Sequence, residues 1–226
     1  SNYNSFEFTR NLSTSGIGVS GRIGLIFRPN NNIRIGGTIH TPKALRLTDS
    51  YFEELYVLND DGTNSDLRTI DKEYTYTVTT PMKYAVQATY LFGKQGFLSA
   101  ELESIDYSTM NITADDNAFI SVNDRITTDY ISTVNLKIGG EYVLDALRLR
   151  GGFASMGNPL GTSEMSRNMI TGGVGVNDKN WSFDLGVVKH LNSDTYIPYS
   201  APGFSTNTVS NNLNGTQLVL SLSTKF

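Results

Sequence analysis

Apolar and polar residues alternate with a period of two along most of this chain, and this pattern limits its fold more than any other feature. In one run, Leu147, Leu149 and Phe153 alternate with Arg148 and Arg150. Such alternation is typical of β-strands with one apolar and one polar face, because successive side chains point to opposite sides. It predicts the end of one strand at 5–10 and nine further strands, at residues 15–28, 33–57, 70–93, 97–112, 128–145, 147–156, 168–178, 181–199 and 216–226.

The connections between these runs alternate between very short and long. Short turns are expected around Pro29–Asn32, Lys94–Gly96, Asp145–Ala146 and Asp178–Asn180. Long polar loops are expected at 58–69, 113–127, 157–167 and 200–215. Outer-membrane β-barrels have this arrangement, with short turns on the periplasmic side and long loops outside. The alternating final run ends on an aromatic residue, Phe226, as such barrels do. The sequence therefore predicts an all-β, antiparallel transmembrane β-barrel in the bacterial outer membrane.

The composition agrees with a membrane barrel better than with a conventional globular core. Charged residues make up 18% of the sequence, whereas soluble domains carry about 25%. Twelve tyrosines and 21 glycines suit a wall that is apolar outside and polar inside. No run of about 18 apolar residues predicts a transmembrane helix. No apolar leader segment opens the chain, and because a barrel must be exported we expect further residues upstream.

Several other classes of protein are disfavoured. The absence of cysteine excludes disulfides and thiolate metal sites. The net charge of -4 and the lack of a basic stripe argue against nucleic-acid binding. The stretch Gly16–Gly21 matches G-x-G-x-x-G but continues into a strand, not into the helix that a dinucleotide site needs. His40 and His190 lack companion ligands, so no metal, cofactor or catalytic set is expected. Loose calcium binding stays an alternative to solvated acids in two loops, at Asp60, Asp61 and Asp66, and at Asp115, Asp116 and Asp124.

Five short stretches and the terminal strand resemble the FadL/OmpP1/TodX family of outer-membrane transporters for hydrophobic compounds, in its Bacteroidetes-like form. The stretches are Gly16–Pro29, Ile33–Pro42, Asp49–Tyr51, Leu147–Phe153 and Asn158–Leu160. The resemblance implies a barrel of 14 strands with an N-terminal plug. It also implies passive uptake of hydrophobic small molecules such as long-chain fatty acids or hydrocarbons. Because this sequence supplies nine or ten strands and no Asn-Pro-Ala plug, residues 1–226 are expected to form one barrel domain that is the C-terminal part of a longer chain.

Two groups of residues are candidates for the site. Ligand capture near the long loops would use apolar residues at the outer strand ends, where the alternative is packing between loops: Pro42, Phe52, Leu55, Tyr74, Tyr76, Phe119 and Ile120. Charged residues on the polar faces would form a salt-bridged lumen in which Glu101 and Glu103 pair with inward arginines: Arg22, Arg34, His40, Glu101, Glu103, Arg148 and Arg150.

Two other readings stay open. A FadL-like barrel can also be a structural or shuttle partner in an outer-membrane protein-secretion complex, and a soluble β-sandwich adhesin would alternate as well. The expected partners of a barrel are membrane lipid, lipopolysaccharide, a hydrophobic ligand and other outer-membrane proteins.

Overall fold

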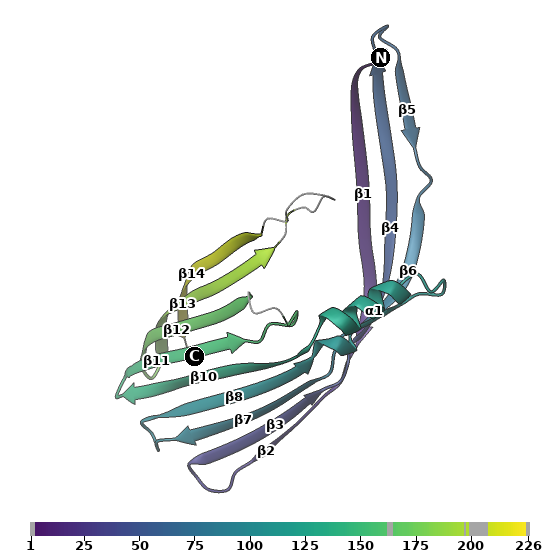
Figure 1. Cartoon of the computed structure of the whole chain (residues 1–226). Coiled ribbons are helices and arrows are strands. Elements are labelled where there is room, and N and C mark those ends of the chain that lie inside the picture. The colour runs from purple at the N-terminus through teal and green to yellow at the C-terminus, as the bar shows by residue number, and fades with distance from the viewer. Residues whose placement is uncertain (1–2, 162–164, 197, 199–207, 225–226) are drawn as a thin grey trace.

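The computed structural model describes residues 3–161, 165–196, 198 and 208–224. In these ranges the chain forms two antiparallel β-sheets, which we call the wall and the ribbon (Figure 1). The wall has nine strands: β2 (Arg22–Phe27), β3 (Ile33–His40), β7 (Lys83–Leu91), β8 (Gly96–Asp106), β10 (Ser132–Leu144), β11 (Leu147–Met156), β12 (Ser166–Asn177), β13 (Trp181–Tyr196) and β14 (Val209–Thr224). The ribbon has five: β1 (Tyr3–Val19), β4 (Ala44–Asn59), β5 (Asn64–Arg68), β6 (Lys72–Thr79) and β9 (Asn111–Thr113).

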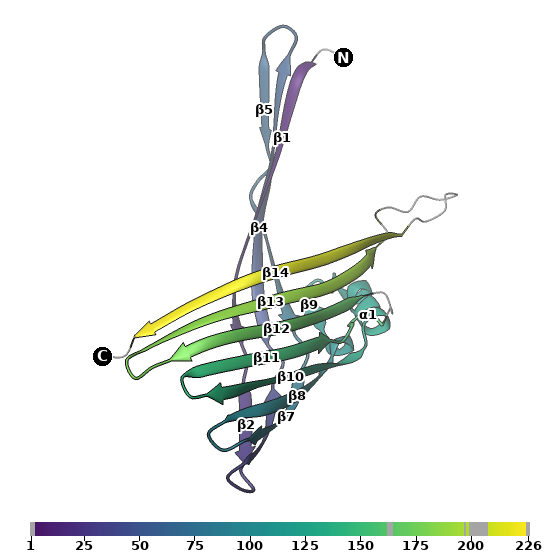
Figure 2. The ribbon, with the colours of Figure 1, turned by 90° about the vertical axis from the view of Figure 1, so that its left-hand side faces the viewer.

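The wall is an up-and-down sheet, so its neighbouring strands also follow one another along the chain. The exception is where ribbon strands lie in the sequence between two wall strands. Its order is β2-β3-β7-β8-β10-β11-β12-β13-β14. The wall's short turns lie at one end of its strands and α1 (Ile120–Asp129) lies toward the other (Figure 2), and the ribbon leaves the wall on the side of α1 (Figure 1). The predicted alternation of short and long connections is thus confirmed. The outer edges of β2 and β14 pair with no other described strand.

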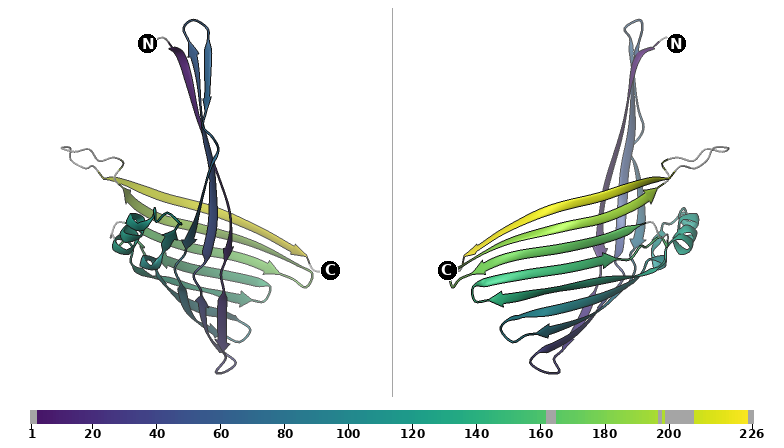
Figure 3. Two further views of the ribbon diagram at one scale, coloured as in Figure 1. Left: turned by 90° about the vertical axis from the view of Figure 1, so that its right-hand side faces the viewer. Right: turned by 60° about the vertical axis from the view of Figure 1, so that its left-hand side comes forward.

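The ribbon projects steeply away from one corner of the wall (Figure 3). Its two longest strands, β1 and β4, have 17 and 16 residues and pair along their whole length. At about 3.3 Å per residue they reach roughly 55 Å. The ribbon and α1 therefore occupy the long-loop side of the wall, where the sequence predicted irregular loops.

The register gives the wall one polar and one apolar face. On β7, Gln87 lies opposite Gly36 and Glu101, whereas the next residue toward the ribbon, Val86, lies opposite Gly37 and Leu102. Cross-strand partners share a face, so charged and small residues line one side. The apolar residues line the other side.

Burial shows which face is concave. The most buried side chains of the wall are Ile105 and Ala154, at 2% and 4% exposure, together with Thr133 and Asn135. All four lie on the polar face, where the curvature crowds side chains together. Large residues of the apolar face remain open; Val86, for example, is 61% exposed. The described sheets share no packed face, so the sandwich reading is wrong, and the exposed apolar surface is what a lipid-facing wall requires.

The predicted strands differ from the observed ones mainly at the junction with the ribbon. Each of the predicted strands 15–28, 33–57, 70–93 and 97–112 is divided into a wall strand and a ribbon strand. The predicted loops contain β5, α1 and the start of β14, which begins at Val209 rather than 216. Phe226 lies outside the described residues. None of the helices in the described ranges is long and apolar enough to cross a membrane.

Candidate functional site

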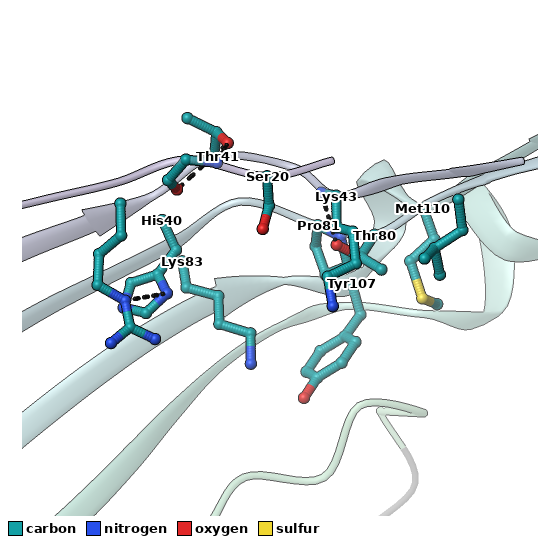
Figure 4. Close-up of a pocket in the computed structure, with 12 residues that line it drawn as sticks. Ser20, His40, Thr41, Lys43, Thr80, Pro81, Lys83, Tyr107 and Met110 are labelled. Carbon is teal, nitrogen blue, oxygen red and sulfur yellow. Dashed lines mark hydrogen bonds between the residues drawn. The ribbon is translucent and has the colours of Figure 1, made fainter. Parts of the chain in front are cut away.

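A cavity lies where four neighbouring strands break at the same level. The breaks fall at 20–21, 41–43, 80–82 and 107–110, between the wall and the ribbon. We call the cavity of about 570 Å³ at this level the junction pocket (Figure 4). Its lining consists of Ser20, Gly21, Arg22, His40, Thr41, Lys43, Leu45, Thr80, Pro81, Lys83, Tyr107 and Met110.

Two Thr-Pro pairs explain the breaks. Pro42 and Pro81 each follow a threonine, and proline has no N–H group to donate to a sheet. The threonines replace the lost pairing. The Thr41 N–H donates to the Gly21 carbonyl at 2.9 Å, and the Gly21 N–H donates to Thr41 Oγ1 at 2.8 Å. Thr80 makes the same pair of bonds with the backbone of Lys43, both at 3.0 Å. The junction is therefore held in place by hydrogen bonds although the strands stop there.

The junction pocket is positively charged. Arg22, Lys43 and Lys83 all line it, and no carboxylate does. Within the described residues none of these three cations has a salt bridge, and the Arg22 Nε–H donates to His40 Nδ1 at 3.3 Å. In Figure 4 the side chains of Lys83 and Tyr107 point to the same side of the strands. Because charges in clefts are balanced by ligands or counter-ions of opposite sign, this arrangement suits an anionic group.

The structure brings three of the predicted ligand residues together at the base of the ribbon. The ring of Phe119 lies 6.1 Å from that of Tyr74 and 5.7 Å from that of Tyr76, and the two tyrosine rings are 6.1 Å apart. The Tyr74 hydroxyl donates to Asp116 Oδ1 at 2.8 Å, which fastens the loop before α1 to β6. Burial raises the pKa of Tyr74, and the hydrogen bond to Asp116 raises it further. The same bond lowers the pKa of Asp116.

The other predicted ligand residues lie apart from this aromatic cluster. Pro42 lies in the break between β3 and β4. Leu55 lies opposite Phe8 and Leu67, higher on the ribbon. Phe52 lies on the opposite face of β4 from Tyr74 and packs under the Arg68 guanidinium at 4.0 Å. Ile120 is 61% exposed at the start of α1. These four do not form one site with the aromatic cluster.

On the concave face of the wall, the predicted charges join a network whose centre is a residue that the sequence did not single out. Glu141 accepts from Arg148 at 3.3 Å and from Arg150 at 2.7 Å, and Arg150 also donates to Asp184. The Glu141 side chain is only 13% exposed. The network links β10, β11 and β13 across the lumen side.

The predicted pairing of Glu101 and Glu103 with arginines is wrong. Glu101 instead binds Lys137 at 2.8 Å, and Glu103 accepts from the Asn135 amide at 2.9 Å. Each partner lies directly across from its glutamate in the register of β8 and β10. The sequence carries the alternation of these residues but not the register, and only the register identifies the partners.

The two other predicted lumen cations lie outside this network. Arg22 lies at the junction pocket beside His40. Arg34 lies near the short-turn end, where its Nη1 donates to the carbonyls of Asn30, Asn31 and Ile33 at 3.1 Å. Across the described residues there is no group of three or more histidine, cysteine or acidic side chains placed to hold a metal ion.

An open wall with a charged concave face and an apolar convex face is the architecture of an outer-membrane β-barrel. Solved structures of hydrocarbon transporters have this fold. The chain is similar to the CymD monoaromatic hydrocarbon channel, with 12% identity and a TM-score of 0.55 over 92% of this chain and 51% of that one. It is also similar to the toluene transporter TodX of Pseudomonas putida, with 18% identity and a TM-score of 0.57 over 98% of this chain and 53% of that one.

These similarities confirm the predicted resemblance to the FadL/OmpP1/TodX family at the level of the fold. A second TodX structure agrees, with 15% identity and a TM-score of 0.53 over 93% of this chain and 50% of that one. The chain thus spans about half the length of the solved structures that it matches. The predicted location, the outer membrane, is that of transporters in this family. Neither a protein-family model nor a curated protein matches the sequence.

Proposed function

We propose that this chain forms part of a bacterial outer-membrane β-barrel that carries hydrophobic small molecules inward without covalent chemistry. The observation that carries the proposal is the two-faced wall, with a lipid-facing apolar surface and a lumen side crossed by salt bridges. The fold shared with transporters described for toluene and monoaromatic hydrocarbons supports the same class of cargo.

The charged network gives the proposal a physical basis. Three ion pairs cross the lumen side within β10, β11 and β13, and Lys137 and Glu101 form another between β8 and β10. We expect side chains fixed in this way to narrow the interior, unlike the wide aqueous lumen of a porin. A hydrophobic solute gains about 25 cal/mol for each Å² of apolar surface removed from water, which is sufficient to draw it into an apolar site.

The test is uptake by the full-length protein reconstituted in lipid vesicles. We expect saturable entry of a radiolabelled hydrophobic compound and no accelerated swelling in small sugars. Empty vesicles and vesicles with an unrelated porin are the controls. Rapid swelling with sugars, or hydrophobic uptake no faster than in empty vesicles, would contradict the proposal.

The ribbon supports a second candidate, a structural or shuttle partner in an outer-membrane protein-secretion complex. It extends roughly 55 Å beyond the junction, and Phe6, Phe8 and Leu12 are exposed on one of its faces. Cross-linking from cysteines placed on this face in living cells separates the two functions. Specific cross-links to other outer-membrane proteins, together with normal uptake, would favour the partner role. A role in transport alone predicts no such cross-links.

A further inference from the structure

The two outer edges of the ribbon differ in length and in charge (Figure 1). On one side the edge strands are β5, with five residues of which two are charged, and β9, with three residues. Short strands and charged side chains are the means by which folded proteins keep a sheet edge from pairing further. On the other side the edge is β1, which has 17 residues, of which two are charged and none is lysine or proline. Its one register shift against β4 lies at the far end, between Tyr3 and Ser5. The β1 edge therefore lacks most of the features that keep an edge strand unpaired.

The register shows which backbone groups lie on this edge. The Glu53 carbonyl accepts from the Thr69 N–H at 2.9 Å, so the backbone of Glu53 points away from β1. Backbone groups alternate along an antiparallel strand, so the residues on either side of Glu53 point to β1, where their partners are Thr9 and Asn11. The alternate residues of β1, Leu12 among them, direct their N–H and C=O groups outward. Among the described strands, none pairs with β1 on that side.

The β1 edge continues the edge of the wall. β1 ends at Val19 and β2 begins at Arg22. Three pairs of neighbouring strands cross this junction and keep the same neighbours in the wall and in the ribbon: β2-β3 becomes β1-β4, β3-β7 becomes β4-β6, and β7-β8 becomes β6-β9. A strand that pairs with the outer edge of β2 is therefore aligned to pair with β1 as well.

A barrel in a membrane leaves no strand edge open, so the outer edge of β2 needs a partner. The other edge strand, β14, does not fit, because it is the ninth strand of an antiparallel series that begins with β2 and so runs in the same direction. Neighbours in outer-membrane barrels are antiparallel. Residues 1–226 span about half the length of the solved structures that they match, so these structures have further chain to supply such a strand.

We infer that the strand which closes the barrel against β2 continues past the junction and pairs with β1 along the ribbon. This closing strand belongs to the part of the protein outside residues 1–226. The inference needs a closed barrel but no particular cargo, so it goes beyond the proposed transport. It makes the ribbon a continuation of the barrel wall on the long-loop side, in place of an arm with an open edge.

The experiment is hydrogen exchange of single amides in the full-length protein, held in lipid nanodiscs and read by mass spectrometry with fragmentation. It compares the N–H groups of Thr9 and Asn11, which point to β4, with those of Phe8 and Leu12, which point to the outer edge. The Asp66 N–H is the control for an open edge, because the register with β4 directs it away from β4.

We expect the four β1 amides to exchange at similar rates, at least about ten-fold more slowly than the Asp66 N–H. Slow exchange at Thr9 and Asn11 with fast exchange at Phe8 and Leu12 would show an open edge and refute the inference. Fast exchange at all four would refute it as well. Slow exchange at Phe8 and Leu12 that depends on the number of protein molecules in each nanodisc would assign the edge to a second copy and also overturn the inference.

The Ile26 N–H separates this inference from the proposed function, because it points to the outer edge of β2. Slow exchange at Ile26 with fast exchange at Leu12 would show a barrel whose closing strand stops at the junction. The inference would then fall and transport would stand. Fast exchange at both would show that the wall is not part of a closed barrel, and the proposed function would fall too.

Two pairs of variants test the same edge by proteolysis. Leu12→Pro removes an outward N–H, whereas Leu12→Ala removes the same side chain and keeps the N–H. Proline cannot donate to a neighbouring strand, so Leu12→Pro should shorten the lifetime of the ribbon under added protease relative to Leu12→Ala. On the open edge of β5, Asp66→Pro and Asp66→Ala should have equal lifetimes. Equal lifetimes of the two Leu12 variants would contradict a strand paired with β1.

Discussion

Charge on the convex face of the wall should be far more costly than charge on the concave face. Val86 lies near the middle of β7, is 61% exposed, and shares its face with Leu102. Arginine at the lipid-facing midplane of an outer-membrane barrel costs about 2–4 kcal/mol. Val86→Arg should therefore lower the folding equilibrium constant by about 30- to 900-fold, at about 1.36 kcal/mol per factor of ten.

The neighbouring residue provides the control. Gln87 points to the concave face, opposite Glu101, where an added arginine meets a carboxylate and water. Gln87→Arg should change the stability by less than about 1 kcal/mol. Both variants of the full-length protein are folded into vesicles of one lipid, and urea titrations report the free energy of unfolding. If Gln87→Arg proves as destabilising as Val86→Arg, the two faces have been assigned wrongly.

Three further predictions concern single contacts. Glu141→Gln removes the charge shared by two arginines and should cost about 1–3 kcal/mol, seen as a lower urea midpoint. Gly152→Ala should lower the free energy of unfolding by about 1–3 kcal/mol, because its new methyl would lie 2.7 Å from Thr171 Oγ1. Gly151→Ala is the control: its methyl meets nothing within 4 Å, so the free energy of unfolding should not change. Equal effects of the two substitutions would contradict this packing. The pKa of Asp116 is depressed, so its bond to Tyr74 holds the loop at neutral pH and is lost as the pH falls through that lowered pKa. Tyr74→Phe should raise the pKa toward 3.8 in a carbon NMR titration; an unchanged pKa would exclude the bond.

The wall was predictable from the sequence because period-two alternation fixes which residues share a face. The alternation of Leu147 and Leu149 with Arg148 and Arg150 placed the arginines on the polar face before any partner was known. Short turns such as Asp145–Ala146 fixed which strands are neighbours. Local pattern and local connection are sufficient for an up-and-down sheet, since each strand pairs with the next.

The ribbon and the site were less predictable, because they depend on contacts between distant parts of the chain. The sequence contains Pro42 and Pro81, and proline interrupts the pairing of a strand. It does not show that both fall at one level with Gly21 and Tyr107 to form a pocket. That coincidence depends on register across four strands. Glu141 was missed for the same reason, because its two arginine partners are identified only by the alignment of β10 with β11.

Alternate residues of each wall strand face lipid on one side and an interior lined by polar side chains on the other. Residues 1–226 contain no cysteine, so single cysteines placed here report without background once any cysteine elsewhere in the full-length protein has been replaced. Placed in turn at 134–138 of β10 in the full-length protein, each is labelled with a fluorophore and exposed to quenchers confined to the bilayer or to water. We expect bilayer quenching at Val134, Leu136 and Ile138 and none at Asn135 and Lys137. Equal bilayer quenching at all five positions, or at none, would contradict it.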